Sequence, residues 1–156
     1  MKIYMADGPS EESFKDILPS FSPEEIYSPD LLSKGYYFTL DAASALKLQR
    51  FRDYVVQVTG SGLLINHGKN LRRGVRSIAD QLAIQAPKGE TWSAHIAGKA
   101  FDISLAKPNG RYDNAYLYSM AKDFAWSAVG EYKSANFVHC DNRDLWGAKQ
   151  ITWSKK

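Results

Sequence analysis

The chain has 156 residues, the length of one ordinary domain, and a second independent core would leave each half marginal. Apolar residues make up 44% and charged residues 24%, as in a soluble globular protein, so the chain should bury a real core. The net charge is only +3 and the basic residues are scattered, whereas a nucleic-acid binder usually carries a basic stripe. We therefore expect one domain spanning residues 1–156 and no nucleic-acid partner.

The chain contains one cysteine, Cys140, so no intrachain disulfide can form. Residues 1–9 lack the apolar run of a signal peptide, and no segment approaches the ~20 apolar residues that cross a bilayer. We expect a monomer made in soluble form in the cytosol, without membrane insertion. If its substrate lies outside the membrane, another component must deliver it.

Prolines recur through residues 1–35, with serine and glutamate between them, at Pro9, Pro19, Pro23 and Pro29. Because proline fixes φ and removes a backbone donor, this stretch should be an irregular N-terminal arm with short helical turns. The next segment, residues 39–59, has a broad apolar face at helical spacing, and Asp41 is suited to cap it. A buried strand is expected at residues 62–66 and a shorter helix at residues 77–85.

Residues 99–106 alternate in the manner of a strand, with Ala100, Asp102 and Ser104 on one face and Phe101, Ile103 and Leu105 on the other. A second strong helix is predicted at residues 114–127. Residues 136–141 form a final predicted strand, which could be the second arm of a hairpin begun near Val129. The sequence thus predicts an α+β fold, in which a small antiparallel sheet is flanked by two main helices.

Two histidines and a carboxylate are candidate metal ligands. His95 lies in the loop that enters the strand bearing Asp102, and the small Ala100 leaves room for an ion beside it. Far downstream, His139 and Asp141 are two residues apart on a strand, so both should project from one face. Two imidazoles and one carboxylate suit a catalytic zinc site with its fourth position open to water. The simpler interpretation is a loop histidine and a strand carboxylate that caps a turn.

The string Ser93-x-His95-x-x-Gly98-x-Ala100-x-Asp102 resembles the signature of the zinc D-alanyl-D-alanine peptidases. This LAS-type family includes D,D-dipeptidases, bacterial zinc carboxypeptidases and phage L-alanyl-D-glutamate endopeptidases. Downstream, Gly130-x-Tyr132 followed by Phe137-Val138-His139-x-Asp141 resembles the closing motif of the family's murein-endopeptidase branch. Upstream, Gly74-Val75-Arg76-Ser77 resembles a step that supplies an arginine. The resemblance covers roughly residues 38–145.

The resemblance implies that His95, Asp102 and His139 bind zinc on the sheet. It also implies that Arg76 steadies the substrate or the developing oxyanion, although a surface arginine paired with Asp80 is the alternative. Ser93 would touch the metal loop or the substrate. Its alternative role is that of a turn-capping serine.

The general base is less clearly indicated. Several family members place an acidic residue three positions before the last histidine, but this chain has Asn136 there. The remaining candidates are Asp141, which we prefer, and Glu131 on the preceding arm. Asp141 could instead orient a ligand imidazole. If neither carboxylate reaches the metal-bound water, the protein is catalytically inactive.

These features together predict a zinc-dependent murein endopeptidase of endolysin or virion-lysin type, which cuts peptidoglycan stem peptides after release to the cell wall. The alternatives are a D,D-carboxypeptidase or dipeptidase, a non-catalytic zinc-binding module resembling hedgehog signalling domains, and a protein that holds no metal. His67 is expected to be a loop residue. Cys140 should face the core as a small apolar side chain, because it alternates with His139.

Overall fold

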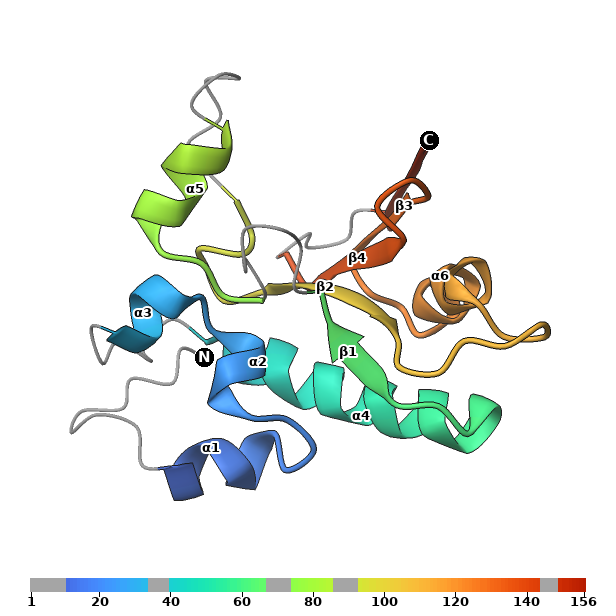
Figure 1. Ribbon diagram of the computed structural model, residues 1–156, viewed down its shortest axis with the longest axis horizontal. Coiled ribbons are helices and arrows are strands. Elements are labelled where there is room, and N and C mark those ends of the chain that lie inside the picture. The colour runs from blue at the N-terminus through green and yellow to red at the C-terminus, as the bar shows by residue number, and fades with distance from the viewer. Residues whose placement is uncertain (1–10, 34–39, 67–73, 86–92, 144–148) are drawn as a thin grey trace.

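The computed structural model describes residues 11–33, 40–66, 74–85, 93–143 and 149–156, and in them six helices accompany a five-stranded sheet (Figure 1). The fold is α+β, as predicted. The strands, in sheet order, are β1 Leu63–Ile65, β2 Ala100–Leu105, β4 Phe137–Asp141, β3 Ala128–Tyr132 and β5 Ile151–Lys155. All neighbouring pairs are antiparallel except β3 and β5, which run parallel. The predicted antiparallel sheet is therefore correct for four of the five strands.

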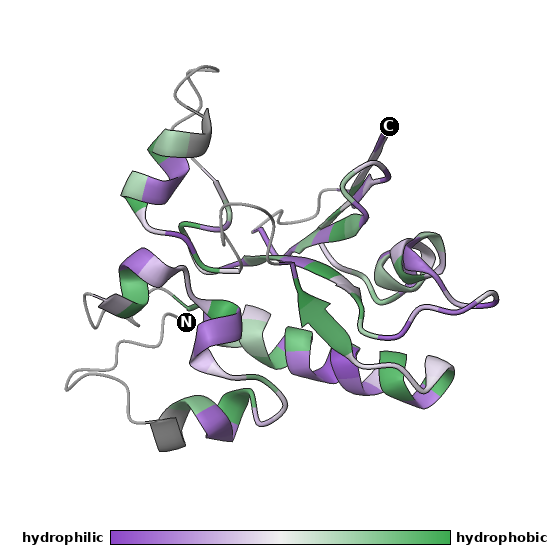
Figure 2. Cartoon of the chain, viewed as in Figure 1, coloured by the Kyte–Doolittle hydropathy of each residue, from purple (hydrophilic) through white to green (hydrophobic). Residues whose placement is uncertain are grey.

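One face of the sheet packs against the two long helices, α4 Ala42–Thr59 and α6 Asn114–Asp123 (Figure 1). The alternation of β2 places three fully or almost fully buried side chains on this face: Phe101, Ile103 and Leu105. Trp126 makes edge contacts with both Phe51 of α4 and Phe101 of β2. β1 is apolar along its length, while α4 alternates between apolar and polar residues (Figure 2). The opposite face of the sheet, which carries Asp102 and His139, is left for the site.

The first turn of α4 follows the predicted capping signal. Oδ2 of Asp41 accepts hydrogen bonds from the backbone N–H of Ser44 at 2.9 Å and from its hydroxyl at 2.6 Å. This satisfies a donor that the first helical turn leaves without a partner. At the other end Gly60 adopts the left-handed conformation and closes the helix.

Two predictions near the C-terminus need correction. The helix predicted for residues 114–127 ends at Asp123, because Ala125 adopts a left-handed φ of 61° that no helix can contain. The strand at residues 137–141 is not the last one, because β5 adds an edge strand beyond it. β5 was missed because four of its five residues are exposed, so its sequence lacks the alternation of a half-buried strand.

The N-terminal segment contains three short helices, α1 Glu11–Ile17, α2 Pro23–Ile26 and α3 Pro29–Ser33. Its buried apolar side chains join the main core: Phe14, Leu18, Phe21, Ile26, Tyr27 and Leu31. The carbonyl of Ile26 accepts hydrogen bonds from the backbone N–H groups of Gly74 and Val75. The segment therefore fixes the backbone that leads into Arg76 and helix α5 Ile78–Gln85.

No helix in the described part of the chain combines the length and the apolar composition that a bilayer crossing requires.

Replacing the cap of α4 provides a test of this architecture. We expect Asp41→Ala to lower the free energy of unfolding by about 1 kcal/mol, because the Ser44 N–H loses its buried partner. Urea denaturation followed by circular dichroism measures the change, with Asp16→Ala, an exposed aspartate of α1, as the control. Equal stability of the two variants would contradict the role given to Asp41.

Candidate metal centre

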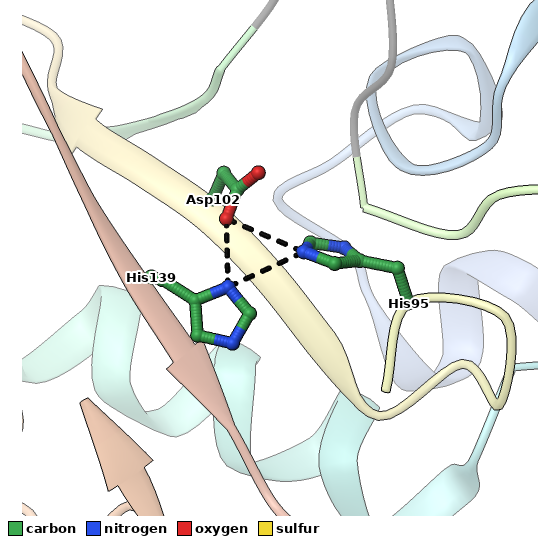
Figure 3. Close-up of side chains that lie close together, drawn as sticks. All are labelled: His95, Asp102 and His139. Carbon is green, nitrogen blue, oxygen red and sulfur yellow. Dashed lines mark hydrogen bonds and ion pairs between the residues drawn. The ribbon is translucent and has the colours of Figure 1, made fainter. Parts of the chain in front are cut away.

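Three side chains from separate parts of the chain meet on the face of the sheet opposite α4 and α6 (Figure 3). Oδ1 of Asp102 lies 2.9 Å from Nδ1 of His139 and 3.4 Å from Nε2 of His95. The two ring nitrogens are 3.3 Å apart. Asp102 comes from β2 and His139 from the facing position of β4, so their meeting follows from the strand register. All three side chains are almost fully buried.

The triangle of ligand atoms has the size that a small tetrahedral ion requires. Zinc binds nitrogen and oxygen at about 2.0–2.1 Å, so two ligands of a tetrahedral site lie about 3.3 Å apart. The three measured separations, 2.9, 3.3 and 3.4 Å, lie close to that value. The cluster could therefore hold a metal ion with little movement of its side chains.

His95 is oriented by a backbone carbonyl. Its Nδ1 lies 2.6 Å from the carbonyl oxygen of Gly74, which can only accept, so Nδ1 carries the proton and Nε2 keeps a free lone pair. The turn that presents the ring is closed by the N–H of Gly98 bonding to the His95 carbonyl, and Gly98 has a positive φ of 66°. Because Ile26 of α2 holds Gly74, the N-terminal helices contribute indirectly to this orientation.

His139 is oriented through its Nε2, whereas His95 is oriented through its Nδ1. Its Nε2 lies 3.1 Å from Oδ2 of Asp141, while its Nδ1 faces Asp102. Figure 3 shows the second ring nitrogen of His139 pointing away from the other two side chains. An Nε2 that donates to Asp141 leaves Nδ1 as the atom that could bind a metal ion. Such a carboxylate behind a ligand imidazole fixes both its tautomer and its angle.

Asp141 is itself held by Arg143, a residue that the sequence analysis did not single out. Nε of Arg143 donates to both carboxylate oxygens, at 2.8 and 2.9 Å, and one terminal nitrogen also contacts Oδ2. The backbone N–H of Arg143 adds a bond to Oδ1 at 3.1 Å. A basic residue two positions after a strand carboxylate was the available signal, but its significance depends on where the carboxylate points.

Burial and charge shift the pKa values of the cluster strongly. Burial alone would raise the pKa of Asp102, but the two neighbouring histidines hold it far below its usual range. Burial would lower the pKa of His139, yet hydrogen bonds from its ring to Asp102 and Asp141 raise it to about 9. For His95, burial dominates and the pKa is lowered. Asp102 therefore presents a full negative charge to a cation, and His95 a neutral imidazole.

Arg76 lies next to the cluster. One terminal nitrogen of its guanidinium donates to Oδ2 of Asp102 at 3.3 Å, and the other donates to Oε1 of Gln81 at 3.1 Å. Asp102 thus uses one oxygen toward the histidines and the other toward Arg76. This contact gives the arginine a role in orienting Asp102, while its action on a substrate or an oxyanion stays a prediction.

The two candidate bases do not reach the centre. Asp141 contacts the side of the His139 ring that faces away from the ligand triangle, so it orients the imidazole and is not placed to activate water. Glu131 pairs with Val138 in the β3–β4 register, so its side chain projects from the opposite face of the sheet. There it accepts a hydrogen bond from Ser154. Asn136 is exposed in the turn before β4.

The remaining candidates have mainly local roles in the described structure. The hydroxyl of Ser93 accepts the backbone N–H of His95 at 3.3 Å, which is the turn-capping arrangement. Cys140 is fully buried on the core side of β4, as expected. His67 lies outside the described residues.

No protein-family model matches this sequence, and no curated protein matches it.

Removing the carboxylate behind His139 tests the arrangement. We expect Asp141→Asn to weaken zinc binding about 10- to 100-fold, because the ring loses the charged partner that fixes its Nε2. Competition against a chromophoric chelator measures the affinity. Glu131→Gln is the matched control, since that carboxylate lies on the other face. The assignment fails if both variants bind zinc as the wild type does.

Metal binding should also stabilise the fold. Zinc that binds only the folded chain adds about 2.7 kcal/mol to its stability when free zinc is 100 times the Kd. We expect the melting temperature to rise with zinc, to fall back with excess chelator, and to be insensitive to zinc in His139→Ala. A wild type that gains no more stability than His139→Ala would show that the triangle binds no ion.

Proposed function

We propose that the chain is a zinc-dependent peptidase that cuts peptidoglycan stem peptides, with a murein endopeptidase as the preferred form. The observation that carries the proposal is the buried triangle of His95, Asp102 and His139, whose separations of 2.9–3.4 Å match tetrahedral coordination. Three protein ligands leave the fourth position for water or substrate, as in catalytic zinc sites.

The donor set favours zinc over the common hard cations. Ca²⁺ takes six to eight oxygen ligands, and Mg²⁺ is usually held by carboxylates and water. Two imidazole nitrogens and one carboxylate oxygen are instead the set that zinc accepts readily. Each histidine also has the supporting partner that metal-bound imidazoles require, Gly74 for His95 and Asp141 for His139.

The chemistry of hydrolysis can be divided between the ion and the chain. When bound, zinc lowers the pKa of a coordinated water and polarises the peptide carbonyl. Asp102, His95 and His139 would hold it, and Arg76 would keep Asp102 aligned through its bond to Oδ2. A fixed guanidinium beside the ligands also supplies positive charge near the position where the carbonyl oxygen becomes negative.

The substrate class comes from the sequence motif. The spacing Ser93-x-His95-x-x-Gly98-x-Ala100-x-Asp102 supports a peptidase acting on stem peptides of the cell wall. A D,D-carboxypeptidase or dipeptidase would use the same ligands. The bond that is cut distinguishes these activities.

A non-catalytic zinc-binding module is the second candidate, and one observation favours it. Of the two carboxylates that the sequence offered as bases, Asp141 is engaged with His139 and Arg143, and Glu131 lies across the sheet. A hydrolase needs a group near the metal-bound water that accepts its proton.

Digestion of purified peptidoglycan separates the two candidates. We expect zinc-loaded wild type to release shortened stem peptides, which mass spectrometry of the muropeptides identifies together with the bond cut. Excess chelator and His139→Ala should each abolish the release, because the ion loses its site. Intact muropeptides after digestion by a protein that demonstrably binds zinc would exclude the peptidase and favour the module.

A further inference from the structure

Trp153 of β5 lies beside the metal centre, although no motif pointed to it. The register aligns Asp102 with His139, His139 with Gly130, and Gly130 with Trp153 across the four strands β2, β4, β3 and β5. Aligned residues project from the same face of a sheet. The sheet face that carries the ligand triangle therefore continues directly to Trp153.

The absence of a side chain at Gly130 leaves the space that the Trp153 indole occupies. A Cβ added to Gly130 would collide with the Trp153 ring, so the ring occupies the space that a side chain would fill. The ring thereby comes within 5.5 Å of the His139 ring, measured between centroids. Glycine weakens the interior of a strand, and it commonly marks a position that another group approaches closely. Here that group is an aromatic ring next to a metal ligand.

A second set of aligned residues on the same face, Phe137, Tyr132 and Lys155, extends the aromatic surface away from the candidate metal centre. Tyr132 stacks on Phe137 at 4.5 Å, and its ring meets Trp153 edge-on at 6.4 Å. Nζ of Lys155 lies 5.3 Å from the Tyr132 ring centre. We call Trp153, Tyr132, Phe137 and Lys155 the aromatic strip. Its three rings are half-buried and Lys155 is exposed, so part of the strip is in contact with solvent.

Packing alone explains only part of the strip. A stacked pair across β3 and β4 strengthens the hairpin, which accounts for Tyr132 and Phe137. The core does not account for Trp153, because the long helices cover the opposite face of the sheet. In a strand whose other four residues are exposed, Trp153 is the one that is half-buried. It is buried against the row that ends in the metal ligands.

We propose that Trp153 is a substrate-binding residue of the metal centre, and that the aromatic strip holds the carboxylate-bearing part of a peptide on one side of the bond that is cut. This inference rests on the proposed function. Flat rings provide apolar contact for the methyl and methylene groups of a short peptide. The Lys155 ammonium pairs with a free carboxylate, and the continuity of the strip with His139 places that segment next to the ion.

Variants of Trp153 test the inference through the split between KM and kcat. We expect Trp153→Ala to raise the KM for a synthetic stem tetrapeptide about 10-fold or more, with zinc affinity unchanged. The KM of Trp153→Phe should lie between the KM values of the wild type and Trp153→Ala. This variant serves as a second test if the alanine variant folds poorly. Tyr116→Ala, which removes an exposed ring from α6, is the matched control and should leave KM unchanged.

The contribution of Lys155 is tested with a pair of ligands. Calorimetry on the zinc-loaded protein compares the tetrapeptide with its C-terminal amide. Wild type should bind the free acid about 10-fold more tightly, and Lys155→Gln should bind both alike. Because calorimetry needs no turnover, it tests the strip even where no cleavage occurs.

Three outcomes would overturn the inference. Trp153→Ala and Trp153→Phe could bind the tetrapeptide as the wild type does, which would leave the peptidase standing without the strip. They could lose zinc together with the peptide, which would make Trp153 a support for His139 only. Wild type could bind acid and amide equally. Failure of the wild type to cut muropeptides, by contrast, counts against the proposed function alone.

Discussion

The site depends on how each ligand imidazole is held from its far side. The carbonyl oxygen of Gly74 accepts a hydrogen bond from Nδ1 of His95, and the carboxylate of Asp141 accepts one from Nε2 of His139. The other ring nitrogen of each histidine is consequently turned toward Asp102, within 3.4 Å of its oxygen. Removing such polar groups from water is costly unless they are paired. Hydrogen bonds from the His139 ring to Asp102 and Asp141 supply that pairing, and they raise the pKa of His139 to about 9.

The groups that orient the two rings come from parts of the chain outside the string from Ser93 to Asp102. Gly74 is positioned by Ile26 of α2, and Asp141 by Arg143 beyond the end of β4. The N-terminal helices are thus linked to the site through one carbonyl. Residues 11–33, which precede the part of the chain that the resemblance covers, are tied by this link to the orientation of His95.

The sequence predicted the parts of the molecule that local order determines. The alternation of β2 and the capped, periodic segment of α4 specify their own structure, and the ligand spacing from His95 to Asp102 lies within one turn and one strand. β5 was missed because an exposed edge strand has no buried side to impose a period. The end of α6 was misplaced because Ala125 adopts the left-handed conformation, which glycine usually marks in a sequence and alanine does not.

The role of Asp141 illustrates what spacing cannot decide. Asp141 lies two residues from His139 on the same strand, so the spacing allows its carboxylate to face either the candidate metal position or the far side of the His139 ring. Only the three-dimensional structure shows that it faces the far side. Burial alone would raise its pKa, but hydrogen bonds from His139 and Arg143 lower it to about 2. A carboxylate with so low a pKa is a good acceptor for Nε2–H and a weak proton acceptor in catalysis, where a pKa near the working pH is favoured. The interaction that fixes the His139 ring therefore makes this carboxylate unsuitable as the general base.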